Sequence, residues 1–203
     1  MVQKKRLKTV ISNLVLIVLA IVMISSIADA WRLETWKIGS SSLSFRVHQD
    51  FGTDSWGHMS QAAQKWNAEA GRTLISVSAI RHTNVNYPAK DSNNYIYRLD
   101  KGLKADYVGQ GTIYLSSDGR TVIEADININ TYHDFANSAQ PNKYDVFTLV
   151  LHEFGHVVGL NHIIIKVGET TYDTAVMWPA QEHNKEKRDL KPDDKAGLAE
   201  RYK

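Results

Sequence analysis

The stretch from Leu151 to His162, LHEFGHVVGLNH, constrains this chain more than any other part of its sequence. Residues four apart lie on one face of a helix, so His152 and His156 can hold one metal ion with their ring nitrogens. Gly159 lets the chain turn at positive φ, and His162 can then return to the same ion from outside the helix. Three neutral imidazoles with one position left for water are typical of a catalytic zinc ion.

Glu153 follows the first of these histidines directly, so its carboxylate can reach a water molecule on the open side of the ion. That position suits a general base in peptide hydrolysis. An interpretation without metal makes Gly159 a simple helix C-cap and His162 a loop histidine. The added glycine and third histidine at a fixed spacing favour the metal site.

The same motif resembles that of the metzincin clan of zinc endopeptidases. Members of this clan have a methionine turn beneath the metal, and Ala175–Pro179 is similar to that turn, with Met177 as its methionine. The matrixin group is the nearest match within the clan, because Leu190–Leu198 is similar to the start of the matrixin C-terminal helix.

This resemblance implies an α+β fold, a metzincin-like zincin domain. Its twisted, mostly parallel sheet would have an antiparallel edge strand, with two long helices, one of them carrying HExxH, and a C-terminal helix. It implies a zinc-dependent endopeptidase whose substrate adds to the edge strand over residues 111–115. Tyr114, Trp178 and Pro179 are then candidate substrate-binding residues. The resemblance also implies that one of the acids at 193–194 ties down the methionine turn; the alternative makes both plain helix-start acids.

Residues 1–30 have the pattern of a targeting segment. Four basic residues precede an apolar run from Val10 to Ile27, and Ala28-Asp29-Ala30 is a small-x-small site that a signal peptidase could cut. An uncleaved membrane anchor is the alternative, because a run of this length can just span a bilayer. Either interpretation places a catalytic domain over residues 31–203 outside the cytoplasm, secreted or anchored to the membrane.

Composition argues against a nucleic-acid partner and against disulfides. The formal charge of +2 becomes −1 once the four cations and one acid of residues 1–30 are removed, and no basic stripe marks a nucleic-acid surface. The chain has no cysteine, so it forms no disulfide and carries no thiolate that could block the metal. We expect a monomer that binds a protein or peptide substrate and one catalytic Zn²⁺.

The rest of the pattern completes the predicted domain. Alternating and apolar segments predict strands at 43–47, 74–80, 95–99, 111–115 and 122–130. A helix is predicted to begin at Ser55, as its N-cap, and to end at Gly71. Asp126, Asn128 and Asn130 alternate on one strand, which favours a solvated face, with a Ca²⁺ site as the alternative.

Two functions outside secreted proteolysis stay open from the sequence. One is a zinc-bearing adhesion or binding module without catalysis, and the intact Glu153 argues against it. The other is a membrane-tethered protease that processes one partner, which depends on whether residues 1–30 are cleaved.

Overall fold

The computed structural model describes residues 31–103, 105, 107–163 and 175–203. The predicted signal peptide or anchor at 1–30 therefore lies outside the described residues. Across these ranges no helix combines the length and the apolar character needed to cross a membrane.

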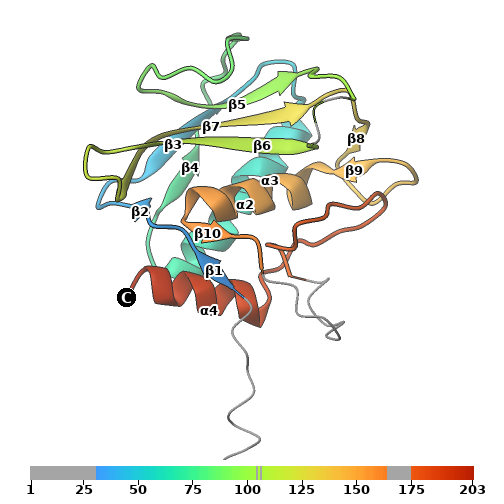
Figure 1. Cartoon of the computed structure of the whole chain (residues 1–203). Helices are drawn as coiled ribbons and strands as arrows, with labels where there is room; N and C mark the ends of the chain where they lie inside the picture. The colour runs from blue at the N-terminus through green and yellow to red at the C-terminus, as the bar shows by residue number, and fades with distance from the viewer. Residues whose placement is uncertain (1–30, 104, 106, 164–174) are drawn as a thin grey trace, which may run out of the picture.

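The centre of the fold is a mostly parallel sheet (Figure 1). Its strands are β2 (Lys37–Ile38), β7 (Thr121–Asn130), β5 (Asn94–Leu99), β3 (Leu43–Val47) and β4 (Ile75–Val77), in that spatial order, with β6 (Gly109–Leu115) added on β7. Every pairing in this sheet is parallel except that of β6 with β7. The predicted α+β fold with an antiparallel edge strand is confirmed, although the strand expected at 74–80 is limited to β4.

Two helices pack against this sheet and a third closes the domain: α2 (Thr53–Ala70), α3 (Val146–Val157) and α4 (Pro192–Arg201). The apolar stripe of α2 is fully buried at Met59 and Trp66, as its helical spacing requires. The prediction that Ser55 caps this helix was wrong. Gly52 is the N-cap, and the Ser55 hydroxyl instead donates a hydrogen bond to Asn137 Oδ1 at 3.0 Å.

The helix α3 is almost completely enclosed, because it packs against both α2 and the sheet. Figure 1 shows α2 and α3 next to each other under the sheet. The indole of Trp66 on α2 donates a hydrogen bond to the carbonyl of Leu151 at 2.9 Å. The ring centroid of Phe154 lies 5.3 Å from that of Phe45 on β3. The element that carries the histidine motif is therefore held rigidly on both sides.

Two short strand pairs complete the fold. The N-terminal strand β1 (Arg32–Leu33) pairs antiparallel with β10 (Leu160–Asn161), directly before His162. The strands β8 (Phe135–Ala136) and β9 (Tyr144–Asp145) form a parallel pair that leads into α3.

The alternating polar side chains of β7 are buried, so the expectation of a solvated face was wrong. Asp126, Asn128 and Asn130 are each 0% exposed. Backbone of a loop and of β5 covers Asp126: its carboxylate accepts the N–H groups of Ala89 and of Tyr95 on β5, at 2.9 and 3.1 Å. Burial raises the pKa of Asp126 to about 6. These acceptors already bind N–H groups, and the Ca²⁺ site suggested for them stays an untested prediction.

Candidate metal centre and cleft

Three histidine side chains converge below the edge strand. His152 and His156 project from α3, and His162 follows β10. The Nε2 atom of His162 lies 3.1 Å from that of His152 and 3.2 Å from that of His156. Within the described part of the chain, these are the residues whose donor atoms group closely enough to hold a metal ion. The structure thus brings together all three predicted ligands.

The return of His162 depends on the turn after α3. Gly159 has φ +95°, a conformation that other residues rarely adopt. A Cβ atom there would also lie 2.5 Å from the carbonyl oxygen of Trp36, so no larger residue fits. The carbonyl of Gly159 accepts the N–H of Glu34 at 2.9 Å, which continues the pairing of β1 with β10. The N-terminal strand therefore helps to place the third histidine.

The second ring nitrogen of two histidines is held by a carbonyl group. His152 Nδ1 lies 2.7 Å from the carbonyl oxygen of Val176, and His156 Nδ1 lies 2.9 Å from that of Leu160. A carbonyl can only accept, so both Nδ1 atoms carry the proton and both Nε2 atoms present a lone pair to the centre.

This donor set fits zinc. A proton on His162 Nε2 can be donated to the Nε2 lone pair of either His152 or His156, but not to both. The remaining lone pair would then face no donor, and a cation between the three nitrogens removes that mismatch. Tetrahedral zinc with Zn–N bonds of about 2.0–2.1 Å places its nitrogen ligands roughly 3.3 Å apart, close to the observed separations. Burial lowers the pKa of all three histidines, that of His156 to about 4, so the imidazoles stay neutral as metal ligands must.

The predicted methionine turn packs against α3 beside this centre. A Cβ atom on Gly155 of α3 would lie 2.2 Å from Met177 Sδ, so the sulfur occupies the space that the glycine leaves. The Asp194 carboxylate accepts the N–H groups of Val176 and Met177, each at 3.0 Å. It also accepts the N–H of Lys191 at 2.9 Å as part of the capping box of α4. The predicted tie from one of the two acids to the turn is confirmed, and the same residue caps its helix.

Glu153 lies against the backbone of the edge strand. It is 4% exposed and forms a hydrogen bond with the backbone of Gly111. A Cβ atom on Gly109 would lie 2.7 Å from Glu153 Oε1, so a glycine there allows the close approach. Burial raises the pKa of Glu153 to about 8, against a smaller opposite effect of the Gly111 bond. A carboxyl group that titrates near neutral pH beside the histidines is suited to accept and return a proton.

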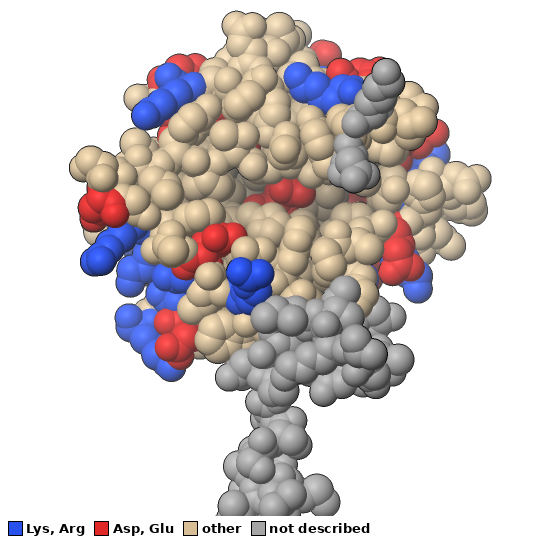
Figure 2. Space-filling view, in the orientation of Figure 1, with Lys and Arg blue, Asp and Glu red and all other residues tan. Residues whose placement is uncertain are grey.

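A cavity of about 400 Å³ opens over these groups. Its walls come from residues 107–111, from α3 with His162, and from Pro179, the last residue of the methionine turn, with Gln181 after it. Figure 2 shows this face hollowed near its centre, with acidic atoms at the floor and mostly uncharged residues around them. Among the described residues that line the cavity there is no lysine or arginine.

The structure separates the three predicted substrate-binding residues. Pro179 lines the cavity, whereas Tyr114 and Trp178 do not. Tyr114 lies further along β6, where Lys90 Nζ is 5.9 Å from its ring centroid, and Trp178 packs against the hydrophobic core. The sequence prediction missed Tyr107, Gln110 and Gln181 as lining residues. It also began the edge strand at Gly111, although β6 begins at Gly109.

Comparison with known protein families identifies one match. The family model described as Matrixin (Peptidase_M10) matches residues 35–203, which is most of the described chain and includes every residue of the site. Among curated proteins no match was found.

Proposed function

Because the chain belongs to the matrixin family, a family of zinc-dependent peptidases, we propose that it is an endopeptidase that cuts protein or peptide substrates. His152, His156 and His162 would hold the zinc ion, and Glu153 would act as the general base. The convergence of the three Nε2 atoms in a cavity that also contains Glu153 carries this proposal.

Each part of the site has a separate role in this proposal. When bound, zinc supplies a Lewis acid that polarises a peptide carbonyl and makes water more acidic. The Glu153 carboxylate accepts a proton from the attacking water and delivers it to the departing amine. The carbonyls of Val176 and Leu160 keep the two α3 imidazoles in one tautomer and orientation.

The free edge of β6 is suited to bind substrate backbone. Val108 accepts the N–H of Asn130 at 2.9 Å, and residues of an antiparallel strand alternate between bonded and unbonded positions. Gly109, Gly111 and Ile113 therefore direct their N–H and C=O groups away from β7, toward the cleft. An extended peptide would add there as a further antiparallel strand, with its scissile bond beside Glu153.

We further propose that the catalytic domain, residues 31–203, acts as a monomer outside the cytoplasm, as is typical of the family. The apolar run and the Ala-x-Ala site in residues 1–30 support export. Mass spectrometry of the mature protein tests cleavage: an N-terminus at Trp31 would support secretion, and an intact segment would support a membrane-tethered protease.

A fluorogenic peptide mixture tests the activity itself. We expect cleavage by the zinc-loaded protein, its loss with a chelator, and its return when zinc is added back. A protein that retained zinc but cut no peptide in the mixture would favour the non-catalytic binding module.

A further inference from the structure

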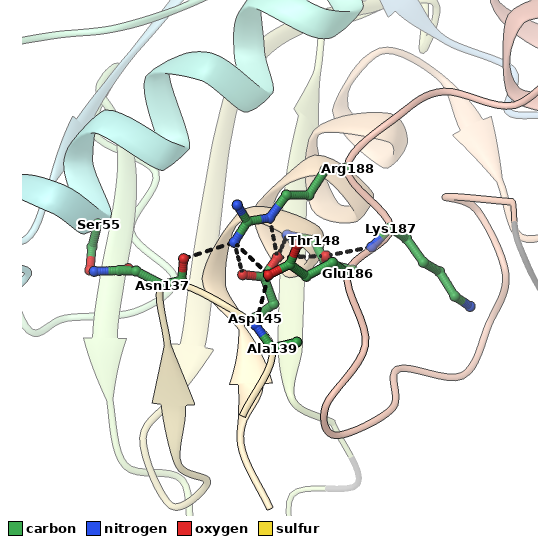
Figure 3. Close-up of polar contacts among 8 residues, drawn as sticks. All are labelled: Ser55, Asn137, Ala139, Asp145, Thr148, Glu186, Lys187 and Arg188. Carbon is green, nitrogen blue, oxygen red and sulfur yellow. Dashed lines mark hydrogen bonds and ion pairs between the residues drawn. The ribbon is translucent and has the colours of Figure 1, made fainter. Parts of the chain in front are cut away.

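The segment that begins with the methionine turn is anchored twice. Asp194 holds its beginning, at Val176 and Met177. Further along, after Pro179 and Gln181 have contributed to the cavity wall, the chain reaches an ion pair between Arg188 and Asp145 (Figure 3). The cavity wall therefore lies between two fixed points.

The second anchor has the geometry of a strong ion pair. Arg188 Nε donates to Asp145 Oδ1 at 3.1 Å, and the Nη2 atom donates to Oδ2 at 2.5 Å. The Asp145 side chain is 0% exposed and that of Arg188 is 27% exposed. Nη2 also donates to the carbonyl of Asn137 at 2.8 Å, and the guanidinium lies 5.3 Å from the ring centroid of Phe147. A bidentate arginine–carboxylate pair fixes the relative orientation of the two side chains as well as their distance, which the single ammonium of a lysine cannot do.

Asp145 connects this ion pair to the helix that carries the motif. It is the N-cap of α3, and its Oδ1 atom accepts the N–H of Thr148 at 2.9 Å. The Thr148 hydroxyl in turn accepts the N–H of Lys187 at 2.9 Å. Figure 3 shows the segment around 186–188 lying against this first turn. Residues 187–188 are thus bonded to the first turn of the helix that carries His152 and Glu153.

We propose that Arg188 is a positioning residue: through Asp145 it sets the distance between the cavity wall at Pro179–Gln181 and the metal-binding helix. It thereby selects the size of the substrate side chain that enters the cleft. This inference rests on the proposed peptidase function.

The test compares two peptides that differ only in the side chain next to the scissile bond, alanine or phenylalanine. In Arg188→Met and Arg188→Lys we expect the ratio of kcat/KM for the two peptides to change about tenfold, a typical effect of pocket size. The change should lie in KM more than in kcat, and zinc content should stay the same.

Asp145→Asn separates the ion pair from the helix cap, because asparagine caps a helix as well as aspartate does. We expect it to change the same ratio, and the double variant with Arg188→Met to add little, since both substitutions remove the same ion pair between Arg188 and Asp145. Asp189→Asn is the matched control. Its exposed ion pair with Lys65, at 2.6 Å, lies on the same segment but joins it to α2 rather than to α3.

Amide hydrogen exchange gives a readout that does not need activity. In Arg188→Met the amides of residues 178–188 should exchange faster, while those of 151–163 stay unchanged. An unchanged peptide ratio in a folded, active variant would overturn the proposal. If the wild-type protein cuts no peptide, the proposed function fails, and hydrogen exchange alone tests the role of Arg188. Equal exchange rates at 178–188 in the wild-type protein and Arg188→Met would then overturn that role as well.

Discussion

Two buried carboxyl groups close to the metal centre differ in how fully they are bonded. Asp194 is 1% exposed and accepts three backbone N–H groups, from Val176, Met177 and Lys191. Glu153 is 4% exposed, and the backbone bond that lowers its pKa comes from Gly111. The first group holds two segments together, whereas the second keeps acceptor capacity for a proton. A buried carboxylate with few hydrogen bonds beside neutral imidazoles indicates a catalytic role, and one whose oxygens are fully hydrogen-bonded indicates a structural role.

The largest expected effect of this difference is on catalysis. Glu153→Gln preserves the shape of the side chain but removes its ability to take a proton. We expect kcat/KM for peptide hydrolysis to fall by about 10³-fold, with zinc content unchanged by metal analysis. Hydrolysis at the wild-type rate would exclude Glu153 as the base.

The same substitution should also change how stability depends on pH in the zinc-free protein. The pKa of Glu153 is raised by burial from 4.5 to about 8, so the folded state holds a proton that the unfolded state releases between these values. The stability that protonated Glu153 contributes is therefore fully present below pH 4.5 and is lost as pH rises through 8. Relative to wild type, Glu153→Gln should gain roughly 3–5 kcal/mol above pH 8 and nothing below pH 4.5.

Urea unfolding of the two zinc-free proteins at pH 4, 6.5 and 9 measures this gain directly. If the difference in unfolding free energy between the two proteins were the same at all three pH values, Glu153 would not be the under-bonded group that its burial indicates.

Replacing the saturated carboxylate should act on stability first. Asp194→Asn retains one acceptor oxygen but turns an amide toward the N–H groups of the methionine turn. We expect a loss of about 2–3 kcal/mol in the free energy of unfolding. Zinc affinity should fall by about tenfold, because the Val176 carbonyl orients His152. Unfolding monitored by circular dichroism and zinc competition with a chromophoric chelator measure the two effects, and unchanged zinc affinity would disconnect the turn from the metal centre.

Local sequence pattern was enough to predict the parts of the site that one segment carries. Helical spacing places His152 and His156 together, and Gly159 predicts the turn that returns His162. The contacts of Asp145 with Arg188 and of Asn130 with Lys101 join segments that are far apart in the chain. Nothing in the local pattern of either partner specifies them. The burial of Asp126 was missed for the same reason, since alternation on a strand cannot show that a loop will cover it.

The cleft wall around Glu153 gives the smallest expected effect and the closest control. A methyl group on Gly109 would lie 2.7 Å from Glu153 Oε1 and 2.8 Å from Leu149 Cδ1, so Gly109→Ala must displace the carboxylate or the edge strand. The same methyl on Gly111 would lie 3.6 Å from Glu153 Oε2, an ordinary contact. We expect kcat/KM to fall about tenfold in Gly109→Ala and less than about threefold in Gly111→Ala. Steady-state kinetics on one fluorogenic peptide, with equal zinc loading, compares them. An equal loss of kcat/KM in the two variants would mean that the glycines are needed for the conformation of the edge strand and not for the space around the Glu153 carboxylate.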